Sequence, residues 1–169
     1  RLVGSEMCIR DSTWYYEPHM INQFSDNYVK VILQAPYEIS IFSNKWTWFD
    51  VHFSFFADTT FNEQQINASC NSILFSINQI IEKENINPKK IYVGGNSQGG
   101  VMACKLALEH PDAIDGFIAH NAFLPIVYQT MTDKSKYSTL RGLVINGDDD
   151  NIIDPINSKQ ITNTFIKLG

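Results

Sequence analysis

Ser97 is the residue whose surroundings point most directly to chemistry, because it lies in the segment GGNSQGG at residues 94–100. The part from Gly95 to Gly99 fits the pattern G-x-S-x-G, which is typical of a nucleophile elbow, a sharp turn that lifts a serine hydroxyl above a sheet. Small flanking residues are needed because side chains would collide across the turn. The three fixed positions also fit a flexible glycine–serine loop, so the pattern needs support from its context.

The sequence on either side of this segment favours the elbow. Residues 90–93 are rich in β-branched and aromatic side chains and follow the turn signal Asn87-Pro88, which predicts a buried strand. Apolar residues at helical spacing in the range 101–108 predict a helix, which His110-Pro111 would end. Strand, turn and helix thus follow in the order that an elbow requires, and we predict that Ser97 is a nucleophile.

A serine nucleophile needs a base, usually histidine, and a carboxylate that orients the base. In α/β-hydrolases the acid follows the serine along the chain, on a loop at the carboxyl end of a later strand. The turn Gly147-Asp148-Asp149-Asp150 follows a predicted strand and is in the right place. Asp148 and Asp149 could simply form the turn, and Asp150 lies deeper in the loop. A solvated turn is the alternative for all three, and a calcium site is disfavoured because the wider EF-hand pattern is missing.

The histidine is harder to assign. The chain has four: His19, His52, His110 and His120. His110 belongs to a helix-ending His-Pro pair and is expected to be a surface cap. His120 follows Ser97 but precedes the acidic loop, so it breaks the expected order of serine, acid and histidine. It could approach the site from the end of its strand, but we favour a catalytic histidine beyond Gly169.

Stabilising an oxyanion requires two hydrogen-bond donors. One donor is expected to be the backbone N–H of Gln98, the residue after the nucleophile. The second normally comes from an early loop near a glycine-rich segment, and nothing between Thr13 and Asn27 resembles such a loop. The sequence therefore identifies one donor of the pair.

The elements that must position these residues alternate along the chain. Strands are predicted at 28–33, 90–93, 114–119 and 140–145, and helices at 66–81, 101–108 and from Asp154-Pro155 onward. An aromatic-rich loop is predicted from Tyr37 to Phe61. Strands that alternate with helices indicate a parallel sheet with helices on both faces. We find no internal repeat and no linker long enough to divide domains.

Composition narrows the class of protein. The chain has 169 residues, of which 44% are hydrophobic and 18% charged, and this suits one folded domain. A net charge of −5 gives no reason to expect binding to nucleic acid or to an anionic membrane surface. No apolar run approaches the roughly 20 residues of a membrane helix. The cysteines Cys8, Cys70 and Cys104 form no metal or redox pattern, so we expect reduced core thiols, no metal, no cofactor and a cytoplasmic location.

The first twelve residues, RLVGSEMCIRDS, fit neither a signal peptide nor a clear amphipathic element. They resemble translated sequencing-adapter sequence. We therefore expect residues 1–12 to be non-native and place the domain at residues 13–169.

Four motifs in order resemble the phospholipase/carboxylesterase family, whose members include the acyl-protein thioesterases. The resemblance covers roughly residues 29–169. The motifs are the nucleophile segment GGNSQGG, Trp48-Phe49-Asp50 with Ala35-Pro36 upstream, Leu124-Pro125 after a strand, and the loop Gly147-Asp148-Asp149-Asp150. Four motifs in the right order are far more specific than any one of them.

This resemblance implies a partial α/β-hydrolase fold, with a mostly parallel sheet flanked by helices. It implies that Ser97 is the nucleophile, Asp150 the triad acid and Gln98 the oxyanion donor. The family's histidine follows about thirty residues after the acid, and its early histidine–glycine loop precedes the strand that begins near Tyr28. Neither is present, so we expect the chain to be a fragment cut at both ends and nearly inactive by itself.

The resemblance also implies a substrate class. Family members hydrolyse carboxyl esters of lipids and small molecules, or acyl thioesters of proteins, through an acyl-serine intermediate, so the expected partner is a small-molecule ester or an acylated protein. Two alternatives stay open: a small-molecule carboxylesterase of another α/β-hydrolase family, and a non-catalytic binding protein with this fold.

Several apolar side chains could line or cover an acyl-binding groove. The candidates are Trp46, Trp48, Phe49, Phe123 and Leu124. The alternative is ordinary packing of a long loop on the sheet, because aromatic residues dominate cores as well as grooves.

Overall fold

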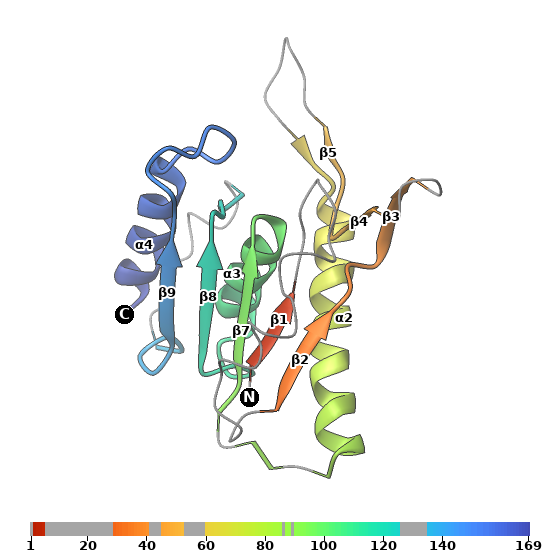
Figure 1. Cartoon of the computed structure of the whole chain (residues 1–169). Helices are drawn as coiled ribbons and strands as arrows, with labels where there is room; N and C mark the ends of the chain where they lie inside the picture. Colours follow the sequence, from red (N-terminus) through yellow and green to blue (C-terminus); the bar gives the residue numbers. More distant parts are fainter. Residues whose placement is uncertain are drawn as a thin grey trace.

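The computed structural model (Figure 1) describes residues 2–5, 29–40, 45–52, 60–85, 87–88, 90–125 and 135–169. The core of the described part is a five-stranded sheet with strand order β2-β1-β7-β8-β9. Its strands are β1 (Leu2–Ser5), β2 (Lys30–Leu33), β7 (Tyr92–Asn96), β8 (Gly116–His120) and β9 (Arg141–Ile145). All four strand pairings are parallel, so the carboxyl ends of the strands share one edge of the sheet.

Strand β1 comes from the segment that we set aside as non-native. Leu2–Ser5 lies between β2 and β7 and pairs in register with both, from Leu2 opposite Lys30 and Tyr92 to Ser5 opposite Leu33 and Gly95. The backbone of residues 2–5 is therefore part of the sheet in this structure, although no sequence pattern predicts a strand there.

Three described helices flank the sheet: α2 (Glu63–Lys83), α3 (Gln98–Glu109) and α4 (Ile156–Leu168). Helix α2 forms where apolar residues recur at helical spacing, and its buried face carries Ile66, Cys70, Ile73 and Ile77. Its N-terminus is capped by Asn62, whose side chain accepts a hydrogen bond from the Gln65 N–H at 3.1 Å. The three predicted helices are thus confirmed: α2 and α3 extend beyond the predicted ranges at both ends, and α4 begins at Ile156, just after the predicted opening at Asp154-Pro155.

The described helices lie against one face of the sheet (Figure 1). Helix α3 packs on β7 and β8, and α4 packs on the same face, because the rings of Phe117 and Phe165 approach to 4.3 Å between centroids. On the opposite face Leu143 and Ile145 of β9 are 52% and 44% exposed. Helices on both faces were predicted, and among the described residues only one face has them.

The segment predicted as one aromatic loop contains short strands. β3 (Tyr37–Ser40) pairs antiparallel with β4 (Lys45–Thr47), and β5 (Val51–His52) pairs antiparallel with β6 (Thr60–Phe61). Pairings this short leave little periodicity to read in a sequence. The bend between β4 and β5 holds Trp48 and Phe49, and its contacts with α3 are described below.

Within the described residues, none of the helices combines the length and the apolar character that crossing a bilayer demands.

Candidate active site

Ser97 lies at the turn between β7 and α3, in the strained backbone conformation that an elbow requires. Its φ and ψ are 53° and −119°, and a positive φ is uncommon for a residue with a side chain. The Ser97 N–H donates to the His120 carbonyl at 2.8 Å, and the Ser97 carbonyl accepts from the Val101 N–H at 3.0 Å. The residue is half-buried, so its position combines a fixed backbone with access to solvent.

The glycines around Ser97 are required by close backbone packing. A Cβ added to Gly95 would lie 2.3 Å from the carbonyl carbon of Gly99, so strand and helix approach too closely for any side chain. A Cβ on Gly100 would lie 2.6 Å from the Cβ of Ala122, in the segment after β8. The flexible-loop alternative is excluded by this geometry, because the glycines pack against backbone and side chains.

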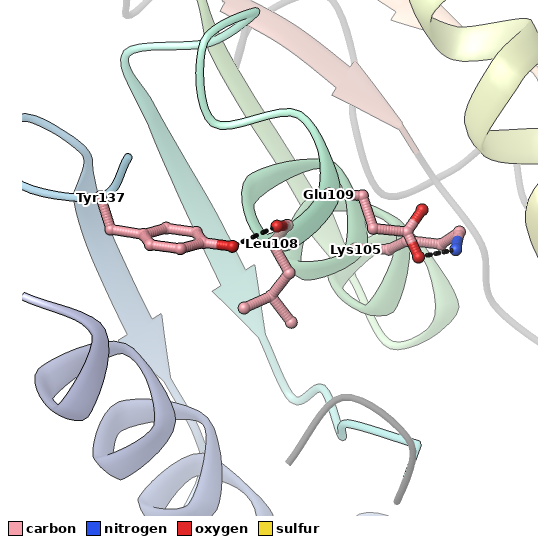
Figure 2. A network of polar contacts seen from close by, with 4 residues as sticks. All are labelled: Lys105, Leu108, Glu109 and Tyr137. Carbon is pink, nitrogen blue, oxygen red and sulfur yellow. Dashed lines mark hydrogen bonds and ion pairs between the residues drawn. The ribbon is translucent and has the colours of Figure 1, made fainter. Parts of the chain in front are cut away.

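Helix α3 is anchored at its other end as well (Figure 2). The Tyr137 hydroxyl donates to the Leu108 carbonyl at 2.5 Å, which satisfies a carbonyl in the last turn. Lys105, although 1% exposed, pairs with Glu109 one turn later. Both ends of the helix that follows Ser97 are therefore held in place.

The side chain of Gln98 has a role that the sequence did not reveal. Gln98 is the first residue of α3 and is 4% exposed. Its Oε1 accepts from the N–H groups of Trp48 and Phe49 at 3.0 and 3.4 Å and lies 2.8 Å from the Thr47 hydroxyl, and its Nε2 donates to the Phe49 carbonyl at 3.0 Å. The elbow is thus joined to a segment about 50 residues earlier in the chain, a contact that no local pattern announces.

The acidic loop follows β9, and its three aspartates differ in exposure and in hydrogen bonding. Asp148 and Asp149 are exposed and form the turn, whereas Asp150 is half-buried. The Asp150 Oδ1 accepts from the N–H groups of Ile152 and Ile153 at 2.8 and 2.9 Å. Its own N–H donates to the Gly147 carbonyl at 3.2 Å. Of the three carboxylates, that of Asp150 is therefore the one with a fixed orientation.

A run of hydrogen bonds connects the elbow with the acidic loop across the end of β8. The Ser97 N–H donates to the His120 carbonyl, and the next residue, Asn121, donates its N–H to the Ile145 carbonyl at 2.8 Å. The Asn121 Oδ1 accepts from the Gly147 N–H at 3.1 Å. Asn121 has a positive φ of 45°, which asparagine tolerates better than most residues. Sequence reasoning missed Asn121, which bridges the two loops.

The described histidines lie on different elements of the fold. His120 ends β8 with an exposed side chain, and its backbone carbonyl, not its ring, contacts the elbow. His110 ends α3, as the His-Pro pair predicted, and His52 is an exposed residue of β5. His19 lies outside the described residues. The ring of His120 remains an unassigned group at the same edge of the sheet as Ser97.

Burial separates the candidate groove residues into two groups. Trp48, Phe49 and Leu124 are 1%, 0% and 5% exposed, which favours packing over lining, whereas Trp46 and Phe123 are half-buried. The Phe123 ring stacks on Phe61, with centroids 4.9 Å apart, and Phe49 meets both rings edge-on at 6.5 and 6.1 Å. Phe61, also half-buried, was not among the candidates.

Two buried acceptors lack partners among the described residues: the side-chain oxygens of Asn96 and Asn146. Asn96 directly precedes Ser97, and Asn146 directly precedes Gly147. Unsatisfied buried polar atoms are rare in folded proteins, and each one calls for an explanation such as strain, a catalytic role, or a bound water or ion. Both lie at the edge of the sheet that carries Ser97 and the acidic loop.

One cluster has the composition of a metal site. Ligand atoms of Cys70, Glu109 and His110 lie within 4.8 Å of one another, at the far end of α3 from Ser97. The Lys105 ammonium already pairs with Glu109, so a cation occupies this position. Burial, opposed by Lys105 and assisted by Glu109, raises the pKa of the Cys70 thiol to about 12, which disfavours the thiolate that a metal needs. We assign no metal to this cluster.

Comparison with known proteins adds a family and a fold. A family model described as phospholipase/carboxylesterase matches residues 11–169, and no curated protein matches. Solved structures that resemble the chain include Arabidopsis thaliana SOBER1, with 19% identity over 99% of this chain and 83% of that chain and a TM-score of 0.67. A carboxylesterase from Mesorhizobium loti has 14% identity over 99% of this chain and 75% of that chain, with a TM-score of 0.73. Esterase PE8 has 17% identity over 99% of this chain and 77% of that chain, with a TM-score of 0.66. At these identities the structures share the fold.

Proposed function

The chain belongs to the phospholipase/carboxylesterase family, and from this membership we propose that it is a serine hydrolase of carboxyl esters or acyl thioesters. The predicted family and the α/β-hydrolase fold are both confirmed. Ester hydrolysis in general is the activity that the family supports.

The nucleophile in this proposal is Ser97, and the observation that carries it is the backbone conformation of the elbow. A positive φ at a serine is costly, and it is retained here by glycine packing that leaves no room for a side chain at Gly95. Such a turn holds the hydroxyl at the carboxyl edge of the sheet, where it can attack an acyl carbon. The attack forms the Ser97 Oγ–carbon bond and breaks the carbon–oxygen or carbon–sulfur bond of the substrate, while a base takes the serine proton and passes it to the leaving alcohol or thiol. Water then hydrolyses the acyl-serine.

The oxyanion of the tetrahedral intermediate would form at the N-terminus of α3. The backbone N–H of Gln98 is the proposed donor. The free N–H groups of a helix N-terminus and the helix dipole both favour negative charge at this place. Because Gln98 is buried and its side chain is fixed, this donor is already oriented before substrate binds.

Asp150 is the proposed triad acid. It is the only aspartate of the acidic loop whose carboxylate is held by two backbone N–H groups, which suits a group that must orient a histidine. The hydrogen bonds of Asn121 support this assignment, because they tie the loop after β9 to the strand end that contacts Ser97. Asp148 and Asp149 remain turn residues in this proposal.

The acyl chain would lie against the stacked rings of Phe61 and Phe123, which keep partial exposure. Phe49 would support this surface from beneath, since it contacts both rings and is fully buried. Trp46 is half-buried and stays a candidate for the groove. An apolar surface of this kind suits the acyl part of lipid esters and of acylated proteins.

The test is hydrolysis by the serine variant. The assay uses the full-length protein, with p-nitrophenyl acetate, p-nitrophenyl octanoate and an S-palmitoyl peptide. Ser97→Ala should lower turnover on the order of a millionfold. Ser76→Ala, on the exposed side of α2, is the matched control and should keep full activity.

Labelling identifies the covalent step. A fluorophosphonate should add one label to the wild type and none to Ser97→Ala, with the label on residue 97 by peptide mass spectrometry. Equal turnover by wild type and Ser97→Ala would overturn the proposal. Binding of acyl compounds without turnover would favour a non-catalytic protein. A preference for S-palmitoyl peptide over the acetate would support the acyl-thioester substrate, and the reverse preference would support a small-molecule carboxylesterase.

A further inference from the structure

The Gln98 carboxamide connects two parts of the molecule that the proposed reaction needs. One part is the elbow, where Gln98 follows Ser97. The other is the bend at Thr47–Phe49, which begins at the last residue of β4 and leads to β5. All four residues that take part, Thr47, Trp48, Phe49 and Gln98, are less than 5% exposed. Loss of these hydrogen bonds would leave buried polar groups without partners, which is destabilising.

Both polar atoms of the carboxamide form hydrogen bonds with the backbone of the bend. Its Oε1 accepts from two consecutive N–H groups, those of Trp48 and Phe49, and its Nε2 donates to the Phe49 carbonyl. A carboxylate could not donate to that carbonyl, and a thioether could neither donate nor accept strongly. Glutamine is therefore the side chain whose chemistry and length fit this position.

A second contact holds the same bend from another direction. The Ser69 hydroxyl, on α2, donates to the Trp48 carbonyl at 2.7 Å, and Ser69 is fully buried. The bend is thus fixed to α2 by Ser69 and to the elbow by Gln98. Of these two contacts, only that of Gln98 involves the proposed oxyanion donor, because the backbone N–H of Gln98 is that donor.

We propose that the side chain of Gln98 is a positioning group for the reaction: it fixes the peptide N–H of the same residue against the buried bend at Thr47–Phe49. The inference rests on the proposed function, because it concerns the oxyanion donor of a serine hydrolase. Without this contact the first turn of α3 can shift against the bend, and the donor loses its alignment with the oxygen that becomes charged.

The expected kinetic signature follows from where the donor acts. An oxyanion donor is engaged more strongly in the transition state than with bound substrate, so its misplacement lowers kcat and leaves KM almost unchanged. A merely structural role would reduce the amount of folded enzyme, or loosen the groove and raise KM for long acyl chains. The split between kcat and KM therefore separates positioning from packing.

The experiment compares two changes that release the same bend. In the whole gene product, Gln98→Met removes the carboxamide at similar volume and keeps the backbone N–H, whereas Ser69→Ala removes the contact from α2. Activity on p-nitrophenyl acetate is measured for the folded fraction, well below the melting temperature of each variant. Gln98→Met should lower kcat at least tenfold with KM within threefold of wild type, and Ser69→Ala should keep kcat within twofold.

A conservative variant keeps the test sharp if Gln98→Met does not fold. Gln98→Glu retains an acceptor for the two N–H groups and loses the donor to Phe49, so kcat should fall at least fivefold. Equal kcat for a folded Gln98 variant and Ser69→Ala would overturn the inference, and so would a Gln98 variant that changes KM alone. The proposed function fails separately, if Ser97→Ala retains the turnover of the wild type.

Discussion

At the elbow, a Cβ added to Gly95 would lie 2.3 Å from the backbone of Gly99, whereas at Gly147, in the acidic loop, an added Cβ would have no atom within 4 Å. The elbow is fixed by backbone packed on backbone. The acidic loop is exposed and is held by side-chain hydrogen bonds, those of Asp150 and Asn121. The proposed nucleophile is therefore held by close backbone packing, whereas the proposed acid is held by hydrogen bonds on a loop with open space around Gly147.

This difference has a physical consequence for how each loop responds to mutation. Closely packed backbone cannot move aside without disturbing other contacts, so a substitution there introduces strain. A loop held by a few hydrogen bonds loses only the bonds that a substitution removes. We therefore expect changes at the elbow to affect folding and changes at the acidic loop to affect chemistry.

Among the changes that test this comparison, the largest expected effect is on activity, at Asp150. Asp150→Asn keeps an oxygen that can accept from Ile152 and Ile153 but removes the charge, and turnover of the whole gene product should fall on the order of 10⁴-fold. Asp149→Asn, on an exposed turn residue, is the control and should stay within twofold. Steady-state hydrolysis of p-nitrophenyl acetate measures both. A larger loss for Asp149→Asn than for Asp150→Asn would move the triad acid to another position of the loop.

The next effect is on stability, at the two glycines. Gly95→Ala should destabilise the fold by about 3 kcal/mol or more, because its Cβ meets backbone that cannot move aside. Gly147→Ala should change the free energy of unfolding by less than about 0.5 kcal/mol. Urea denaturation followed by circular dichroism gives both values. Similar values for the two variants would remove the contrast between the loops.

Asn121 tests the connection between the loops. Asn121→Ala loses the acceptor for the Gly147 N–H and places alanine at a φ of 45°, with an expected cost of about 2 kcal/mol. Asn85, at the end of α2, has the same φ and is the matched control for strain alone. Asn121→Gly relieves the strain and isolates the hydrogen bond.

The outcome for Asn121 is read from two measurements. Asn85→Ala should cost about 1 kcal/mol without changing activity, whereas Asn121→Gly should lower kcat severalfold with little change in stability. Unchanged kcat in Asn121→Gly would show that the acidic loop keeps its position without this hydrogen bond.

The smallest effect is the pH dependence of folding stability that arises from the two buried thiols, those of Cys70 and Cys104. Burial raises the pKa of Cys104, on α3, and raises that of Cys70 to about 12. Unfolded thiols release protons above about pH 8.5 while the folded ones stay protonated, so stability is present below that pH and falls as pH rises above it. Each thiol contributes a slope of at most about 1.4 kcal/mol per pH unit.

Urea denaturation at pH 8, 9 and 9.5 measures this slope. Cys104→Ala should make the decrease with pH shallower, although the cavity lowers stability at every pH. An identical slope in wild type and Cys104→Ala would show that the thiol is accessible to water in the folded protein.

The sequence by itself determined the elements whose signals are local. The elbow, the helix at Glu63–Lys83 and the alternation of strands and helices follow from glycine spacing and from apolar periodicity, which depend on backbone geometry within a few residues. Ser97 and the acidic loop could be named for the same reason. A parallel sheet then brings their strand ends to one edge, whatever the intervening sequence.

Only the tertiary structure decided which partners these residues have. The Gln98 carboxamide binds residues about 50 positions away, and Asn121 joins two loops across a strand end. Trp48 and Phe49 are buried whereas Phe61 and Phe123 keep exposed surface, a division that residue type does not encode. Leu2–Ser5 completes the sheet although nothing in its sequence demanded it. Contacts of this kind depend on long-range packing, which periodicity and local propensity do not specify.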